Sequence, residues 1–488
     1  MAEATQRRGE LATELPSKYL PAVEYRDLPD PVPLRKIVGA SVILLATAIG
    51  SGELIIWPYI TTTVGVGLLW LAAFGFATQY FLNMEIERYT LVTGETAVTG
   101  FSRFWKPWGI VFALGAILPN AFPGWAASGA TMITYLIGGG SVPLIATIGL
   151  IAIGLAITVS PVIYQTLEKV EMVLVIIIVA FLLLAIVIAT DASVWAGIVT
   201  EAPSGIANLP RYINELGIAT ILGAIAFAGA GGASNLVQSN WIRDKGLGMG
   251  AHMPKIVSPI TGEEEAAPSI GYMMRTDEEN VRRFKGWWKV ANQEQIFTFV
   301  ILGLLTLIGL SVLVASVLPQ GTYGEPGDIA FLQKEAQALA NQIGTWFEYF
   351  FYIAGFAVLF STNIGIIDYV SRLTADTLKT GYLAESEFWT ESKIYFVIAW
   401  IMCIAGSAIL FAGLEQPLVL LIIASAGGGV VMFFYSGMLI WLNRRALPEP
   451  VRLKGVRLVA MVITFVFFAI LSTYLLGWYI WAAATGQL

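Results

Sequence analysis

Two glycine-rich interruptions inside long apolar segments restrict most strongly what this chain can fold into. Residues 50–53 (GSGE) interrupt the first hydrophobic segment, and residues 229–235 (GAGGASN) interrupt the sixth. A helix that spans a bilayer must satisfy its backbone polar groups internally, so an unwound stretch at mid-membrane survives only where it is buried or lines a water-filled cavity. Two breaks placed five segments apart are typical of secondary transporters built from inverted repeats.

The composition places the chain among polytopic membrane proteins. Of its 488 residues, 57% are hydrophobic and 13% are charged, which a soluble protein does not combine. The single cysteine, Cys403, excludes an intrachain disulfide and a thiolate metal cluster, and the only histidine, His252, lies in a polar loop. The first 35 residues are polar and proline-rich, so no cleavable signal peptide is expected. No cofactor and no nucleic-acid partner is predicted.

Apolar runs long enough to cross a bilayer predict eleven helices. They lie at about 36–63, 66–91, 107–138, 143–160, 164–190, 216–241, 287–318, 344–375, 391–412, 417–443 and 455–480. We expect a cytoplasmic N-terminal segment at 1–35, a first repeat of helices 1 to 5 at 36–190, a second repeat of helices 6 to 10 at 216–443, and an eleventh helix at 455–480. Residues 244–286 form the one sizeable polar connection.

Lysine and arginine predict the orientation in the membrane. Of the 28 basic residues, all but Arg211 and Lys334 belong to the N-terminal segment and to alternate connections. The positive-inside rule therefore places the N-terminus in the cytoplasm and the C-terminus outside. We expect a multi-pass protein of the cell (inner) membrane, with the lipid bilayer as a partner.

The first break offers both backbone donors and a carboxylate. Gly50 and Gly52 permit close approach of a ligand to the backbone, and Ser51 adds a hydroxyl group. Free N–H groups at the start of a half-helix favour an anion. Glu53 adds three alternatives, since it can cap the half-helix, take a proton or ligate a cation.

The second break carries no charge. Its candidate substrate-binding residues are Gly231, Gly232, Ala233, Ser234 and Asn235. Ser234 and Asn235 are predicted to cap the outgoing half-helix. Asn363 in helix 8 is a further candidate ligand near the midplane. Close glycine-mediated helix packing is the alternative interpretation of this break.

Charged residues inside the spans are expected to be paired or functional. Glu85 and Arg88 are three residues apart in helix 2, and Asp368 and Arg372 are four apart in helix 8, so both predict internal ion pairs. Asp368 is, with Glu53, a candidate for proton coupling. Glu168, Lys169 and Glu171 at the start of helix 5 are expected at the membrane interface.

Several stretches resemble the Nramp family of metal-ion transporters. The run AIGSGELIIWPYITTTV at 48–64 is similar to the family's first helix, and ERYTLVTGET at 87–96 is similar to the end of its second. YQTLEKVEMVLV at 164–175 resembles its fifth helix, and 221–224 and 235–236 resemble parts of its sixth. The resemblance implies an all-α LeuT-type fold with a 5+5 inverted repeat, broken helices 1 and 6, an eleventh helix, and a substrate site between helices 1 and 6.

The chain departs from this family where the family binds metal. The family's Asp-Pro-Gly-Asn sequence in helix 1 is replaced by residues 50–53, with Glu53 at the asparagine position. Its Met-Pro-His sequence in helix 6 falls near Gly232, Ala233 and Ser234, and its acidic residues in helix 3 are missing from LPNAFPGW at 118–125. The Gly-Ser-Gly turn is instead similar to the carboxylate-binding turn of amino-acid transporters with the same fold.

Two hypotheses for the transported substrate follow. The first is a proton-coupled secondary active transporter of a small anion, bicarbonate or another carboxylate-like anion, with Glu53 as the proton carrier. The alternative is a transporter of a divalent cation, Mg²⁺ or Mn²⁺, ligated by Glu53, Ser234, Asn235 and Asn363. An enzyme is not expected, because no histidine lies in a span and no paired carboxylates meet at one break.

Overall fold

The computed structural model describes residues 10–37, 50, 52–159, 163–253, 270–322 and 327–485. Within these ranges, nine helices are long and apolar enough to cross a membrane. The other two predicted spans are the interrupted helices 1 and 6. The first half of helix 1 and Ser51 lie outside the described residues.

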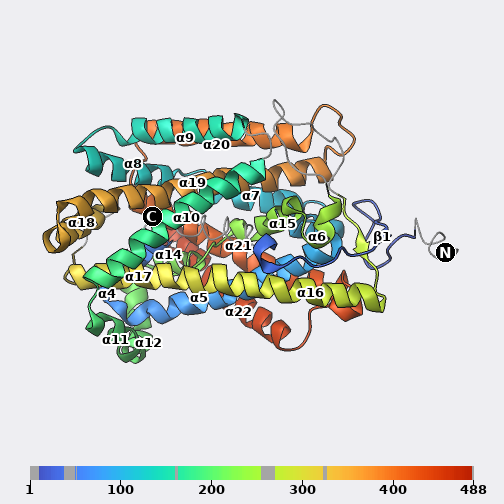
Figure 1. The fold of residues 1–488 in the computed structure, drawn as a ribbon, viewed down its shortest axis with the longest axis horizontal. Coiled ribbons are helices and arrows are strands. Elements are labelled where there is room, and N and C mark those ends of the chain that lie inside the picture. Colours follow the sequence, from blue (N-terminus) through green and yellow to red (C-terminus); the bar gives the residue numbers. More distant parts are fainter. Residues whose placement is uncertain are drawn as a thin grey trace.

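The long helices run side by side along the longest axis of the molecule (Figure 1). Their bounds are α5 (Leu69–Thr93), α7 (Trp108–Asn120), α8 (Gly124–Ile137), α9 (Val142–Val159), α10 (Ile163–Ala189), α16 (Glu278–Glu294), η4 (Gln295–Leu302), α17 (Gly303–Val317), α19 (Thr345–Gly381), α20 (Glu391–Phe411), α21 (Pro417–Arg445) and α22 (Val456–Thr485). Helix α19 is central, since it packs against α7, α8, α10, α15 and α20. Helices α9 and α20 lie together along one edge.

The structure describes the helix 6 break in full and the helix 1 break except for Ser51. Helix 1 continues from Gly50 through a π-helical segment, η1 (Gly52–Ile56), into α4 (Trp57–Val64). Helix 6 consists of α14 (Ile218–Ala226) and α15 (Ala233–Lys245), which are joined by an irregular stretch at 227–232. Gly229, Gly231 and Gly232 all have positive φ in this stretch. Glycine adopts this region without the steric cost that a side chain adds, so the glycines permit the break.

Short elements lie at the two ends of the bundle (Figure 1). One end carries α11 (Ala192–Thr200), α12 (Ala202–Ala207), α13 (Leu209–Leu216) and α18 (Ala330–Ile343). The other end carries β1 (Tyr25–Arg26), α6 (Ala97–Phe104), η3 (Gly248–His252), β2 (Met273–Met274) and η5 (Glu449–Val451). The remaining short elements are α2 (Leu34–Ile37) and η2 (Val66–Leu68). Strands β1 and β2 pair in parallel and join the N-terminal segment to the connection between helices 6 and 7.

One predicted boundary is wrong, and the structure adds two features that the sequence analysis did not predict. Helix 7 begins at Glu278, with Asp277 as its N-cap, so the polar connection ends earlier than residue 286. Helix 3 is interrupted between α7 and α8 next to Pro123, which cannot donate a backbone hydrogen bond. Helix α18 lies in a stretch that the hydrophobicity pattern left without structure, since its apolar face is only one side of an amphipathic helix.

Candidate functional site between the helix 1 and helix 6 breaks

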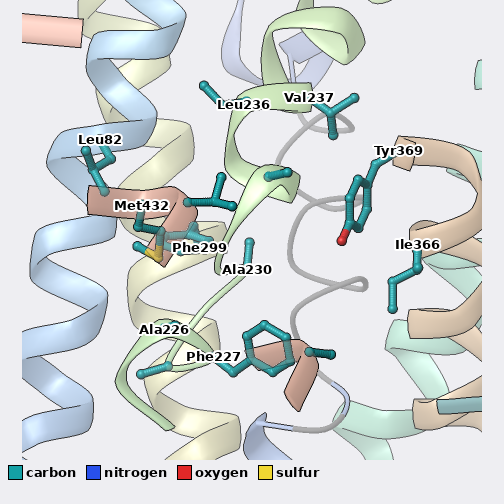
Figure 2. Packing of buried hydrophobic residues seen from close by; sticks show 14 of the residues in the cluster. Leu82, Ala226, Phe227, Ala230, Leu236, Val237, Phe299, Ile366, Tyr369 and Met432 are labelled. Carbon is teal, nitrogen blue, oxygen red and sulfur yellow. The ribbon is translucent and has the colours of Figure 1, made fainter. Parts of the chain in front are cut away.

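The two breaks contact each other directly. A Cβ on Gly52 would lie 1.9 Å from the backbone oxygen of Phe227, at the end of α14. The Trp57 indole donates a hydrogen bond to the oxygen of Ala224 (2.8 Å). Figure 2 shows the irregular stretch between α14 and α15, which contains Phe227 and Ala230, with Tyr369 of α19 on one side of it. The absence of a side chain at Gly52 thus allows the unwound part of helix 1 to approach helix 6.

Glu53 is a fully buried carboxylate at this contact. Its side chain is 0% exposed, and its Oε2 accepts a hydrogen bond from the backbone N–H of Gly50 (3.3 Å). The backbone N–H of Gly229 in helix 6 also interacts with the carboxylate. Among the described residues, Glu53 Oε1 has no hydrogen-bond partner and no basic side chain pairs with Glu53. A buried carboxylate without a cation costs several kcal/mol, so this group requires a proton or a cation as partner.

Gln79 of α5 supports the helix 6 break, and the sequence interpretation missed it. Its Nε2 donates to the oxygens of Ala226 (2.8 Å) and Ala228 (2.7 Å), and its Oε1 accepts from the N–H of Gly231 (3.0 Å). One side chain therefore satisfies carbonyl groups at the end of α14 and an amide group of the break. Gln79 could have been identified from the sequence as a glutamine inside an apolar span, because an uncharged polar group in a bilayer needs hydrogen-bond partners.

The predicted capping role of Ser234 and Asn235 is wrong. Gly232 is the N-cap residue of α15, and α15 has no side-chain cap. Ser234 Oγ donates to the oxygens of Ala230 and Gly231, so it serves the break and not the helix end. Asn235 donates to Asn83 Oδ1 of α5 (2.6 Å), while its own Oδ1 has no partner within the described part of the chain.

The remaining predicted site residues are Gly50 and Gly232 at the two breaks, Ala233 at the start of α15, and Asn363 in α19. A Cβ on Gly232 would lie 2.9 Å from the Cα of Gly428, so Gly232 packs against helix α21. The Thr362 hydroxyl occupies the space beside Gly50. Asn363 is the next residue of α19 and is buried, as is Ala233. Ser51 lies outside the described residues.

Asp368 lies in a buried ion network between α15, α19 and α20. The predicted pair with Arg372 is present, with Nη2 2.7 Å from Asp368 Oδ1. Tyr395 and the Trp241 indole also donate to the Asp368 carboxylate (2.8 Å each). Both oxygens of Asp368 therefore accept hydrogen bonds within the protein, and its predicted part in proton coupling stays a prediction.

The network continues between α15, α19 and α20. Arg372 also binds Asp244, and the neighbouring Arg243 lies 2.6 Å from Asp376 and 2.8 Å from Glu391. The two arginines are fully buried. The predicted Glu85–Arg88 pair is present as well, at 2.7 Å. The ion pairs of Arg243 and Arg372 tie the second half of helix 6 to helices 8 and 9.

Glu171, which was predicted at the membrane interface, is buried inside the protein. Its side chain is 0% exposed, and it accepts a hydrogen bond from Ser361 of α19. Glu168, three residues earlier, is partly exposed and pairs with Lys245. The position of Glu171 within helix 5 puts it on the face that packs against α19, which the hydrophobicity of the span does not reveal.

Comparison with known proteins identifies the fold. No protein-family model matches the chain, and no curated protein matches it. A mutant of the Eremococcus coleocola manganese transporter is similar in structure, with a TM-score of 0.63, 14% identity, and coverage of 91% of this chain and 88% of that chain. The complex of that transporter with an aromatic bis-isothiourea compound has a TM-score of 0.62 at 12% identity, covering 95% and 90% of the two chains.

A second type of solved structure shares the architecture. MhsT in complex with L-phenylalanine has a TM-score of 0.54 at 13% identity, covering 91% of this chain and 99% of that chain. The fold implied by the Nramp resemblance is therefore confirmed. At these identities the likeness is one of fold, and the chain is an all-α, multi-pass membrane protein with the LeuT-type transporter fold.

Proposed function

We propose that this chain is a secondary transporter of a small hard cation, Mg²⁺ or Mn²⁺, which binds between the helix 1 and helix 6 breaks. The proposal rests on buried side-chain oxygen atoms in and near the two breaks that have no hydrogen-bond partner among the described residues. Glu53 Oε1 and Asn235 Oδ1 are buried oxygens with no hydrogen-bond partner in the described part of the chain, and Gln238 Oε1, further along α15, is another. Oxygens of carboxylate and amide groups are the ligands that Mg²⁺ and Mn²⁺ prefer.

The donors of the breaks, by contrast, are already engaged with the protein. The N–H groups of Gly50 and Gly229 face the Glu53 carboxylate, and the N–H of Gly231 binds Gln79. An anion would have to displace the Glu53 carboxylate, which has the same charge sign. The geometry therefore supports the cation hypothesis better than the anion hypothesis.

Two further features support a hard cation. Residues 50–53 and 227–235 contain no histidine, cysteine or methionine, and soft transition metals favour those ligands. One carboxylate with a few amide oxygens suits Mg²⁺, which retains several waters when it binds protein. The solved structures with a similar fold include a manganese transporter.

The test is cation binding by the native protein and by Glu53→Gln. Calorimetric titration with Mg²⁺, Mn²⁺ and bicarbonate is compared with uptake of each into proteoliposomes. We expect the native protein to bind and carry a divalent cation, and Glu53→Gln, which removes the negative ligand, to lose that binding. A bicarbonate response in the native protein without a metal response would reject the cation hypothesis in favour of the anion.

We also propose that the end carrying β1 and α6 faces the cytoplasm, as the distribution of basic residues predicts. An impermeant thiol reagent added outside should label Ala192→Cys, in α11, and should not label Ala384→Cys, in the connection between α19 and α20. Both native side chains are exposed, and the native Cys403 is buried. The opposite labelling pattern would show that the end carrying β1 and α6 faces outside and would contradict the proposed orientation.

A further inference from the structure

Glu171 of α10 is a second carboxyl group buried inside the bundle. Its side chain is 0% exposed, and its Oε2 accepts a hydrogen bond from the hydroxyl group of Ser361 in α19. Its other oxygen, Oε1, has no hydrogen-bond partner among the described residues. The proposed cation site around Glu53 does not use this group. An ionisable residue buried in a membrane helix is costly, so Glu171 is expected to have a function of its own.

The helices around Glu171 bring no free positive charge to it. Within the described ranges, no basic side chain pairs with Glu171. Helices α15, α17, α18 and α19 pack against α10. Helix α17 has no titratable side chain. The ion pairs of α15 and of the neighbouring part of α19 are Asp368–Arg372, Asp244–Arg372, Arg243–Asp376 and Lys245–Glu168.

The charged residues of α18 are remote from Glu171. Helix α18 carries Lys334 and Glu335 and lies at the end of the bundle that also carries α11 (Figure 1). Helix α10 ends at Ala189, just before α11, and Glu171 lies about 27 Å back along the helix at 1.5 Å per residue. Ser361 is therefore the polar group that the described structure provides for Glu171.

The neutral acid fits these surroundings better than the carboxylate. A buried carboxylate without a cation costs several kcal/mol, and one hydroxyl group does not replace the water that it loses. In the protonated form, Glu171 is itself able to donate to the Ser361 hydroxyl. The oxygen left without a partner then belongs to an uncharged carbonyl group, which is less costly to bury. A divalent cation, by contrast, needs about six oxygen ligands.

Helix α19 connects Glu171 with the helix 1 break. Ser361 is followed in this helix by Thr362, whose hydroxyl occupies the space beside Gly50. The backbone N–H of Gly50 in turn donates to the Glu53 carboxylate (3.3 Å). A movement of α19 relative to α10 would therefore change the packing of the break at which we propose that the cation binds.

We propose that Glu171, positioned by Ser361 between helices 5 and 8, is the proton-binding site that couples a proton to cation transport. The inference rests on the proposed transport function. With the proton bound, the contact between α10 and α19 is uncharged. Release of the proton leaves an unpaired negative charge in this contact, which favours an arrangement in which water reaches Glu171. The protonation state thus biases the packing of α10 against α19.

Infrared spectroscopy of the purified protein in lipid measures proton binding without transport. We expect the carbonyl band of protonated carboxyl groups, recorded at neutral pH, to lose intensity in Glu171→Gln. Ser361→Ala should shift that part of the band in frequency, because the acid loses its hydrogen-bond partner. The control Glu449→Gln, whose native side chain is 75% exposed, should leave the band unchanged. An unchanged band in Glu171→Gln would overturn the proposal.

Uptake of Mg²⁺ into proteoliposomes, with and without an imposed pH gradient, tests the coupling. Glutamine resembles the neutral acid but releases no proton, so Glu171→Gln should bind Mg²⁺ in calorimetry as the native protein does. Its uptake should be the same with and without the gradient, whereas uptake by the native protein and by Glu449→Gln should respond to it. A response retained in Glu171→Gln, or absent from the native protein, would overturn the coupling role.

The proposed function and the proton site fail in different ways. If the native protein binds no divalent cation, the proposed substrate is wrong, and the infrared band still decides whether Glu171 holds a proton. If Glu171→Gln does not fold, Ser361→Ala carries the test, because it leaves the carboxyl group in place. A band with the same frequency in Ser361→Ala as in the native protein would then overturn the proposal.

Discussion

Replacing Gln79 with leucine tests whether this residue holds the helix 6 break open. The side chain is fully buried and makes three hydrogen bonds of 3.0 Å or less with the backbone of Ala226, Ala228 and Gly231. Leucine has a similar volume but no polar atom, so these three backbone groups lose their partner. The fold around them is otherwise unchanged.

The expected loss of stability follows from the number of orphaned groups. A buried backbone group without a partner costs about 1–3 kcal/mol, and partial relaxation limits the sum, so we expect a loss of about 3–6 kcal/mol. An unfolding entropy of roughly 2 cal/mol/K per residue gives about 1 kcal/mol per kelvin for a chain of this length. The midpoint of thermal unfolding should therefore fall by about 3–6 °C.

The assay is thermal unfolding of purified Gln79→Leu in detergent or lipid, combined with cation uptake in proteoliposomes. The matched control is Gln320→Leu, because Gln320 is exposed and makes one hydrogen bond, to Thr63 (3.1 Å). We expect the control to change stability by less than about 1 kcal/mol. If Gln79→Leu unfolds within about 1 °C of the native protein and transports normally, Gln79 does not support the break.

Three further perturbations test other parts of the site. Gly52→Ala should destabilise the protein by about 1–3 kcal/mol and abolish uptake, because the added Cβ would lie 1.9 Å from the backbone oxygen of Phe227. Gly381→Ala is the control for the stability and uptake measurements, because nothing lies within 4 Å of its added Cβ. Arg372→Met should lower the free energy of unfolding, measured with heat or denaturant, by about 3–5 kcal/mol, because it leaves buried carboxylates unpaired. The control Arg282→Met should lower it by less than about 1 kcal/mol, because the native Arg282 side chain is 76% exposed. Burial raises the pKa of Glu335 in α18 well above its ordinary value. The free energy of unfolding should therefore fall as pH rises from about 4.3, the pKa of glutamate in the unfolded chain, to the raised pKa of the folded protein. Glu335→Gln should show a smaller fall, and a pH profile identical to that of the native protein would contradict the prediction.

The amino-acid sequence determined much of the architecture by itself. The lengths of the apolar runs specify membrane-spanning helices, because the bilayer thickness requires about 20 apolar residues in each. The glycine runs at 50–53 and 229–235 specify the two interruptions, because only glycine adopts the backbone angles found at Gly231 and Gly232 without strain. Ion pairs at i,i+3 and i,i+4 spacing, such as Asp368–Arg372, are likewise local and therefore predictable.

Only the tertiary structure decided which groups at the breaks remain free for a ligand. The sequence shows that Gly231 has an amide donor, but the engagement of that donor by Gln79 depends on packing of α5 against helix 6, about 150 residues apart in the chain. The burial of Glu171 against Ser361 is long-range in the same way. Hydrophobic periodicity specifies which segments enter the membrane, whereas helix packing specifies which polar atoms find partners there and which are left for a cation or a proton.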